Sequence, residues 1–318
     1  MSALSELSHL KHRGPVTPEQ RAARRKEASH DNKSGYVFLF PRLVGLFVFT
    51  LGPILASLYL SLTDYSLIQA PNFLGLDNYE RMLTDDRLHQ SLKVTLIYVG
   101  VGVPLQLALA LGVAVLLNKG MRGLAFYRSV FYLPSMLGSS VAIALLWRQI
   151  FGTTGLVNQV LQLLGLDATT GYVSDPDYAL WTLILLNVWT FGSPMVIFLA
   201  GLRQIPTMYY EAAALDGASR ISQFARITMP LLSPIIFFNL VLQIINAFQA
   251  FTQAFVVSNG TGGPSDSTLF YTLYLYEQGF TRFDMGYASA MAWLLLAIIA
   301  TFTAVNFLLA KFWVFYDD

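Results

Sequence analysis

The sequence has no cysteine among its 318 residues, and only 12% of its residues are charged. Without a thiol, the chain forms no disulfide, no thiolate metal site and no cysteine nucleophile, although the redox compartment stays open. The formal net charge of +1 provides no surplus of positive charge for a nucleic-acid surface. We therefore expect neither a disulfide-stabilised domain nor a nucleic-acid-binding protein.

Histidine is also scarce, and the usual catalytic motifs are missing. The four histidines, which all lie outside the apolar runs, are His9, His12, His30 and His89. No His-x-x-x-His pair or carboxylate cluster accompanies them, so we interpret them as solvated and expect no metal centre. The sequence has no Gly-x-x-x-x-Gly-Lys-Ser/Thr phosphate loop and no Gly-x-Ser-x-Gly nucleophile turn. We expect no catalytic residue and no cofactor on this chain, so any ATP hydrolysis belongs to another chain.

The sequence is rich in hydrophobic residues, which make up 55% of it and form long apolar segments. About 20 apolar residues in a helix span the hydrocarbon core of a bilayer. The segments that satisfy this are 36–62, 94–117, 130–147, 179–200, 231–257 and 285–310. We predict an all-α polytopic membrane protein with six transmembrane helices in a domain at 36–318, preceded by a basic tail at 1–35. Prolines in or near these segments predict kinks or late helix starts.

The distribution of lysine and arginine predicts the orientation, since cytoplasmic segments retain positive charge. Fourteen of these residues lie on one side, counting seven in the tail, three in 118–129, three in 201–230 and Lys311. The opposite side has five, together with 11 carboxylates. Both termini are therefore expected in the cytoplasm. The basic cluster at 21–26 is interpreted as part of a solvated tail, with contact to anionic lipid or nucleic acid as the alternative.

The polar segment 201–230 is expected to be the longest cytoplasmic loop. Within it, "MYYEAAAL" contains strong helix formers, Gly217 suits the left-handed conformation that ends a helix, and "SRISQFARI" predicts a second helix before Pro230. We predict two short helices with a sharp bend at Gly217. From the residues alone, a loop whose charges are simply solvated is the favoured interpretation.

A family resemblance favours a specific role for this loop. "EAAALDGA", followed by Phe224, Ile227 and "MPLLSP", is similar to the loop signature of permease subunits of ABC importers, with Met229 where that signature has leucine. "FLGLDNYERML" (73–83), "FYRSVFYLP" (126–134), "WTFGSPMVIFLAGLRQIP" (189–206) and "GYASAMAWLL" (286–295) resemble the maltose and glycerol-3-phosphate type. The resemblance covers most of the chain after residue 36.

The resemblance implies a coupling helix that docks in a cleft of a cytoplasmic ATPase. It implies that Glu211 faces a basic group there, that Ala212 and Ala213 permit close approach, and that Gly217 makes the bend. Asp216 is assigned to the same surface with a less defined role. The implied assembly lies in the cytoplasmic (inner) membrane of a bacterium or archaeon. It has a second, related permease, two ATP-binding subunits that hold ATP and Mg, and an extracytoplasmic sugar-binding protein.

Polar side chains within the apolar segments indicate where a substrate passes. One predicted helical face is formed by Asn239, Gln243, Asn246, Gln249 and Gln253. Asn187, Thr190 and Ser193 add polar groups in 179–200, with Trp189 beside them. Amides and aromatic rings suit a sugar or related polyol. The alternative is a stripe that hydrogen-bonds to a partner permease. Tyr271, Tyr274 and Tyr276 are interpreted as an aromatic belt at the membrane interface.

Two other functional classes fit the sequence less well. A membrane-embedded enzyme needs catalytic groups such as paired Asp, His or Ser/Lys within its spans, and these segments contain essentially none. A secondary transporter with its own ion coupling is expected to show buried carboxylates or broken-helix repeats, and neither is evident from the sequence.

Overall fold

The computed structural model describes residues 39–120, 123–166 and 169–315. Within these residues every regular element is helical, and the only β-structure is three isolated bridges. The predicted all-α class is therefore confirmed. The chain divides into two compact units at the boundary between Tyr59 and Leu60, and each unit is described by itself. The tail at 1–35 lies outside the described residues.

The first unit contains most of one apolar helical run, Leu39–Leu60. This run includes a π-helical turn, η1 (Leu46–Leu51), and the helix α3 (Gly52–Leu60). None of the described residues in this unit is buried by the rest of the chain. An apolar helix that exposes its side chains all round is typical of a segment that faces lipid. The run corresponds to the predicted segment 36–62.

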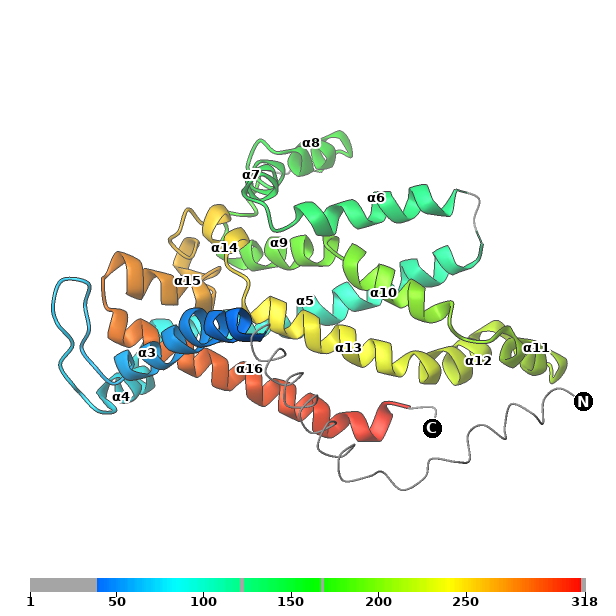
Figure 1. Ribbon diagram of the computed structural model, residues 1–318. Coiled ribbons are helices and arrows are strands. Elements are labelled where there is room, and N and C mark those ends of the chain that lie inside the picture. The colour runs from blue at the N-terminus through cyan, green and yellow to red at the C-terminus, as the bar shows by residue number, and fades with distance from the viewer. Residues whose placement is uncertain (1–38, 121–122, 167–168, 316–318) are drawn as a thin grey trace, which may run out of the picture. The chain divides into compact units, whose positions relative to one another are not determined.

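The second unit contains the remaining helices, which Figure 1 labels along the chain. Before the 201–230 loop they are α4 (Asp77–Thr84), α5 (Asp86–Asn118), α6 (Leu124–Leu137), α7 (Val141–Ile150), α8 (Leu156–Leu163), α9 (Pro176–Trp189) and α10 (Gly192–Leu202). From the loop onward they are α11 (Thr207–Leu215), α12 (Arg220–Gln223), η2 (Phe224–Thr228), α13 (Met229–Phe248), α14 (Thr252–Val257), η3 (Pro264–Asp266), α15 (Tyr271–Tyr276), η4 (Glu277–Thr281) and α16 (Met285–Trp313).

The helices are long and apolar enough for five continuous spans among the described residues, and for a sixth if α6 and α7 together make one. The predicted segment 130–147 is not a single straight helix, because α6 and α7 meet at an angle of 96°. Gly138 and Ser139 lie at this break, and the side chain of Ser140 caps α7 by accepting from Ile143 N. The kink expected near the proline of this segment is therefore a sharp break, and a pair of short helices forms the segment.

The core of the second unit forms around α5, which packs against α9, α10, α13 and α15. Buried apolar side chains such as Val103 and Leu107 recur along its length. Pro104 lies inside α5 and Pro234 inside α13, yet both helices continue through them. Helix α6 approaches α10 closely at Gly192, where an added Cβ would lie 2.3 Å from the carbonyl oxygen of Phe131. This contact requires glycine, because any larger residue would push the two helices apart.

Candidate functional site

A polar cavity of about 420 Å³ lies where α5, α6, α9, α10, α13 and α14 meet. Its lining side chains are uncharged: they are amides, hydroxyls and a few apolar or aromatic groups. Carboxamides both donate and accept hydrogen bonds, and hydroxyls do the same. Tyr98 and Phe251 add ring surfaces to this lining. The cavity therefore offers hydrogen bonds and flat apolar faces, with no ionised group in its wall.

Helix breaks supply much of this polar lining. Thr190 lies at the break between α9 and α10, and its carbonyl oxygen accepts hydrogen bonds from Ser135 Oγ at 2.9 Å and from Gln106 Nε2 at 3.2 Å. The hydroxyl of Ser135 also accepts from Ser193 N at 2.8 Å. These contacts join α5, α6 and α10. They satisfy backbone groups that a break leaves without an intrahelical partner.

A second break lies directly across the cavity. Helix α13 ends at Phe248, and α14 begins at Thr252. From α14, the Gln253 Nε2 donates to the carbonyl oxygen of Gly138, at the break between α6 and α7, over 3.1 Å. The predicted span 231–257 lies within one apolar run, 220–257, but the regular helical spacing expected of its polar face ends at this break. Because the chain bends, Gln253 reaches the cavity from a different helix than Gln243 does.

The structure brings most of the predicted pathway residues together. Those that line the cavity are Asn187, Gln243, Asn246, Gln249 and Gln253, joined by Thr190 and Ser193. Asn239 does not line it, because the rest of the chain buries its side chain completely. Neither amide atom of Asn239 has a hydrogen-bond partner among the described residues. Trp189 packs against Trp147, with ring centroids 6.0 Å apart, and is also absent from the lining.

Sequence reasoning missed several lining residues, among them Gln106, Ser135 and Ser139. Gln106 carried a usable signal, since it is an isolated amide in the middle of the apolar helix α5. A lone polar side chain within a span usually faces a cavity or the interior of the bundle. Ser135 and Ser139 carried no comparable signal, because their position depends on the break after α6.

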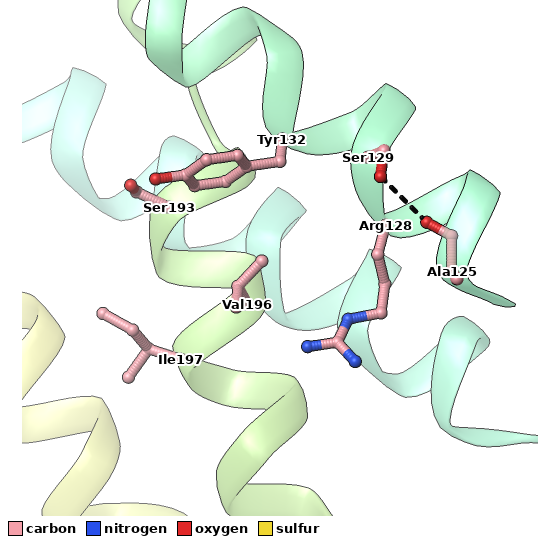
Figure 2. A pocket seen from close by; sticks show the side chains of 7 residues that line it. All are labelled: Ala125, Arg128, Ser129, Tyr132, Ser193, Val196 and Ile197. Atoms are coloured by element: carbon pink, nitrogen blue, oxygen red, sulfur yellow. Dashed lines mark hydrogen bonds between the residues drawn. The ribbon is translucent and has the colours of Figure 1, made fainter.

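A second cavity, of about 520 Å³, lies between α6 and α10, as Figure 2 shows. It shares Ser193 with the first cavity and extends along α10 to Ile197, toward the 201–230 loop. Of the described residues, Arg128 is the only one that places a charged side chain in its lining, where it lies with Tyr132. Arg128 forms no ion pair with any described residue. The two cavities thus follow one another along α10, with a positive charge in the second.

The 201–230 loop contains the predicted bend at Gly217. Gly217 has φ +75°, its N–H donates to the carbonyl of Ala214 at 3.1 Å, and Ala218 N donates to Ala213 O at 2.9 Å. This pair of hydrogen bonds with a left-handed glycine is the Schellman motif that ends a helix. The second helix does not stop before Pro230 as predicted, because α12 and η2 run directly into α13.

The surface of this loop is open. Glu211, Ala212 and Asp216 are exposed and Ala213 is half-buried. Neither Glu211 nor Asp216 forms an ion pair with a described residue. Leu215 is 90% exposed beside them. The two carboxylates and the exposed leucine thus lie on the second half of α11 and its C-cap.

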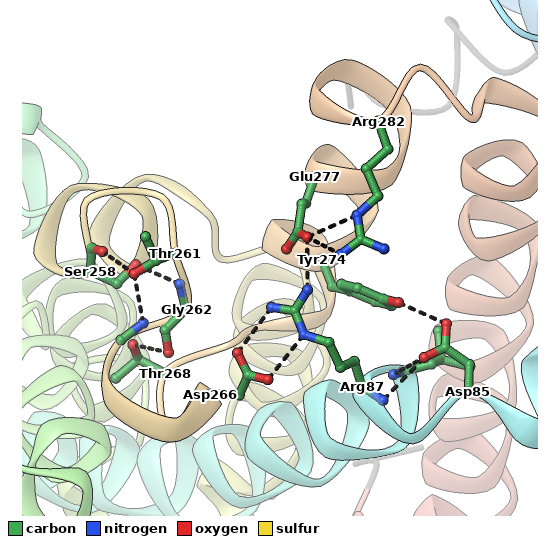
Figure 3. A network of polar contacts seen from close by, with 12 residues as sticks. Asp85, Arg87, Ser258, Thr261, Gly262, Asp266, Thr268, Tyr274, Glu277 and Arg282 are labelled. Atoms are coloured by element: carbon green, nitrogen blue, oxygen red, sulfur yellow. Dashed lines mark hydrogen bonds and ion pairs between the residues drawn. The ribbon is translucent and has the colours of Figure 1, made fainter.

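A polar network occupies the opposite end of α5, as Figure 3 shows. Arg87 pairs with Asp266 at 3.0 Å and with Glu277 at 2.7 Å, and Arg282 pairs with Glu277 at 2.7 Å. Asp85 caps α5 by accepting from the N–H groups of Arg87 and Leu88. These contacts join the start of α5 to η3 and to the junction of α15 and η4.

The predicted interfacial belt of tyrosines was wrong for two of its three members. Tyr271 is fully buried and its hydroxyl donates to the carbonyl oxygen of Met291 at 2.7 Å. Tyr274 is also buried, and its hydroxyl donates to Asp85 Oδ2 at 2.8 Å. Only Tyr276 is exposed. Polar partners elsewhere in the fold draw the first two rings inward, and these partners are distant in sequence.

Comparison with known proteins places this architecture in a family. The model of binding-protein-dependent transport system inner membrane components matches residues 87–313. The probable ABC transporter permease protein YesP of Bacillus subtilis (strain 168) is 52% identical, over 91% of this chain and 94% of that protein. The lactose transport system permease protein LacF of Rhizobium radiobacter is 33% identical, over 87% and 94%.

One solved structure supports the fold independently. It is the crystal structure of a bacterial alginate ABC transporter in complex with an alginate pentasaccharide-bound periplasmic protein. One of its chains matches this fold with a TM-score of 0.77 at 20% identity, covering 90% of this chain and 96% of that one. The trehalose/maltose transport system permease protein MalF of Thermococcus litoralis is 31% identical, over 88% of this chain and 94% of that protein. This chain therefore belongs to the family of inner membrane components of binding-protein-dependent transport systems, and it is a permease subunit of an ABC importer.

Proposed function

We propose that this permease subunit forms half of the membrane pathway for an uncharged saccharide, and that the polar cavity of about 420 Å³ holds the saccharide during transport. The observation that carries the proposal is the lining, which combines amides, hydroxyls and two ring faces with no ionised side chain. A volume in this range is ordinary for a small-molecule site. The relatives named for lactose and for trehalose and maltose are permeases for neutral sugars, which supports the same substrate class.

The second cavity extends the proposed saccharide pathway toward the 201–230 loop. It continues from Ser193 by about one helical turn along α10, toward the 201–230 loop. Tyr132 presents a ring and a hydroxyl there, and Arg128 presents a guanidinium group with several donors (Figure 2). Sugar hydroxyls accept hydrogen bonds from such donors. The two cavities then act in sequence as the inward leg of the pathway.

The 201–230 loop is the proposed docking surface for an ATP-binding subunit. The exposed turn with Glu211, Ala212, Ala213 and Asp216 is the contact surface, and the Schellman motif at Gly217 fixes the angle at which it projects. Because α12 and η2 continue into α13 without a break, a displacement of the loop is carried directly to the helix that bears Gln243 and Asn246. One continuous helix thus joins the docking surface to the saccharide cavity.

The proposed assembly has a second, related permease, two ATP-binding subunits that hold ATP and Mg, and an extracytoplasmic binding protein that delivers the saccharide. ATP hydrolysis takes place on the ATP-binding subunits, and this chain needs no cofactor of its own. The split of 14 basic residues against five supports an orientation with both termini and the 201–230 loop in the cytoplasm. The network around Arg87 then faces the outside.

The test uses proteoliposomes that contain the complete transporter and its binding protein, and it measures uptake of radiolabelled saccharides. The panel contains lactose, maltose, trehalose and arabinobiose as neutral members and digalacturonate as a charged member of similar size. We expect ATP-dependent uptake of at least one neutral member and none of digalacturonate, because a carboxylate must lose its hydration in the first cavity, whose lining offers no ionic partner, before it can reach Arg128 in the second. Uptake of digalacturonate alone would overturn the proposal.

A further inference from the structure

A third cavity, of about 480 Å³, lies between the end of α5 and the 201–230 loop. Its wall comes from parts of the chain that are far apart in sequence. Asn118 and Lys119 belong to the end of α5, whereas Arg220 and Gln223 belong to α12. This cavity shares no lining residue with the two saccharide cavities. It is therefore a separate site, with chemistry of its own.

The charge in this cavity is unbalanced. Lys119 and Arg220 both line it, and none of the aspartates or glutamates that the structure describes does. Neither cation forms an ion pair with a described residue. The nearby carboxylates of the loop, Glu211 and Asp216, are exposed and are absent from the lining. Two positive charges that share one concave surface attract an anion more strongly than either charge does alone.

Tyr210, Thr228 and Gln223 form hydrogen bonds, which leaves the two cations and the amide of Asn118 as the principal free donors among the described residues of the wall. The hydroxyl of Tyr210 is hydrogen-bonded to that of Thr228 at 2.9 Å, and Gln223 Nε2 donates to the carbonyl oxygen of Ala218 at 3.2 Å. Arginine offers a fork of N–H donors that fits the oxygens of a phosphate, and lysine offers a compact positive charge. A phosphate group uses both kinds of donor at once.

The rest of the wall is apolar. It is formed by Val115, Leu202 and Phe224, and two of these belong to helices that end here, α5 at Asn118 and α10 at Leu202. A cavity whose wall contains both cations and apolar side chains suits a phosphate that carries an organic group. Basic pockets at the ends of membrane helices bind phospholipid headgroups in this way.

We propose that this cavity binds a phosphate-bearing anion between Lys119 and Arg220, either the headgroup of an anionic phospholipid or a free phosphate compound. The bound anion bridges the end of α5 to α12 and thereby ties the 201–230 loop to the core of the fold. The inference concerns a different cavity from the one proposed for the saccharide. Its failure leaves the saccharide proposal untouched, and the reverse also holds.

The experiment uses the complete transporter, purified in detergent and freed of bound lipid. In one arm it is incubated with dioleoylphosphatidylglycerol or dioleoylphosphatidylcholine, and retained lipid is counted by native mass spectrometry. In the other arm, binding of ³²P-labelled inorganic phosphate is measured by equilibrium dialysis. We expect Lys119→Gln with Arg220→Gln to lower binding of at least one phosphate probe by at least about tenfold, because each lost cation in close contact removes roughly a fivefold factor in water.

The matched control is Arg203→Gln with Arg226→Gln, which removes the same charge from two exposed residues that do not line the cavity. We expect it to change binding less than twofold. Lys119→Arg with Arg220→Lys keeps both charges and should retain binding, which separates charge from misfolding. Retention of phosphatidylglycerol alone identifies a lipid headgroup, and binding of inorganic phosphate alone identifies a free compound. The proposal would be overturned if both double glutamine variants lost phosphate binding equally, or if the unmodified transporter bound neither phosphate probe.

Discussion

The hydroxyl of Tyr287, in the first turn of α16, donates a hydrogen bond of 2.7 Å to Asp85 Oδ2, the residue that caps α5. The same oxygen accepts from Tyr274. One carboxylate therefore satisfies the first N–H groups of α5 and holds two tyrosines from other helices. Because these partners lie 189 and 202 residues away in sequence, Asp85 links the beginning of the bundle to its end.

The first prediction concerns the stability that Asp85 contributes. Asp85→Ala removes an N-cap and leaves two tyrosine hydroxyls without their acceptor, so we expect a loss of about 2 kcal/mol in the free energy of unfolding. Thermal unfolding of the purified protein in detergent measures it. The control is Asp86→Ala, which removes the same charge from the exposed neighbouring residue. Equal effects of the two substitutions would contradict the assigned role.

The second prediction is the pH dependence of this contribution. Burial on its own raises the pKa of Asp85, but hydrogen bonds from Tyr287, Tyr274 and two backbone N–H groups bring it below its ordinary value of 3.8. A carboxyl whose pKa is lower in the folded state stabilises the fold above its unfolded pKa, and this stability is lost as the pH falls through the folded pKa. We expect the difference in Tm between the unmodified protein and Asp85→Asn to shrink below about pH 4. A difference that is constant between pH 3 and pH 7 would show that the carboxylate charge contributes nothing.

The third prediction tests the bend at Gly217. Apart from Gly217 and its neighbours in the chain, no atom of the described residues lies within 4 Å of a Cβ added there, so the cost of a side chain is backbone strain at φ +75° rather than crowding. Gly217→Val should keep ATP hydrolysis by the assembled transporter but lower saccharide uptake at least tenfold, because valine avoids the left-handed region. Gly217→Asn is the control, since asparagine tolerates that conformation. Normal uptake with valine would remove the basis for a fixed bend.

The fourth prediction separates the saccharide pathway from a contact with the partner permease. Replacing Gln243 and Asn246 with leucine removes two amides from the cavity lining. A site that hydrogen-bonds sugar hydroxyls should then lose uptake or change its preference, with the partner still bound. Loss of the partner in detergent, with selectivity unchanged in the complexes that remain, would favour the contact instead. Asn239→Leu is the matched control, because Asn239 is buried and lines no part of the cavity.

The fifth prediction concerns orientation and uses the absence of cysteine. Leu163 is 86% exposed at the end of α8, and Leu215 is 90% exposed in the 201–230 loop. A cysteine at Leu163 should react with a membrane-impermeant maleimide in intact cells, whereas a cysteine at Leu215 should react only after permeabilisation. Labelling of Leu215→Cys in intact cells would reverse the proposed topology.

Local features of the sequence predicted much of this fold. Five of the six apolar segments are spans by length and composition, and the glycine at 217 takes the left-handed conformation expected of it. Both inferences depend on chemistry within a few residues of the position concerned. Hydropathy also identified the third segment, but hydropathy averages over a window and does not register a 96° bend at Gly138.

The remaining errors came from contacts between residues distant in sequence. Asn239 has the same residue type and helical spacing as Asn246, yet neighbouring helices cover one and leave the other open to the cavity. From the sequence alone, the tyrosines of α15 resemble an interfacial belt. The fold brings Asp85, almost 200 residues earlier, within hydrogen-bonding distance of Tyr274. A helical period specifies which face a residue occupies, but not what covers that face.

The hydrogen bond from Gln253 to the carbonyl oxygen of Gly138 also bears on how the protein is made. A chain inserted into the membrane from its N-terminus exposes the break after α6 while the donor, 115 residues further on, has not yet been synthesised. Neither α6, with 14 residues, nor α7, with 10, is long enough to cross a bilayer alone. The carbonyl oxygen of Gly138 therefore gains the hydrogen bond from Gln253 only after α14 has been synthesised. Formation of this contact is a late step in biogenesis, after the lipid-embedded parts of α5 and α9 are in place.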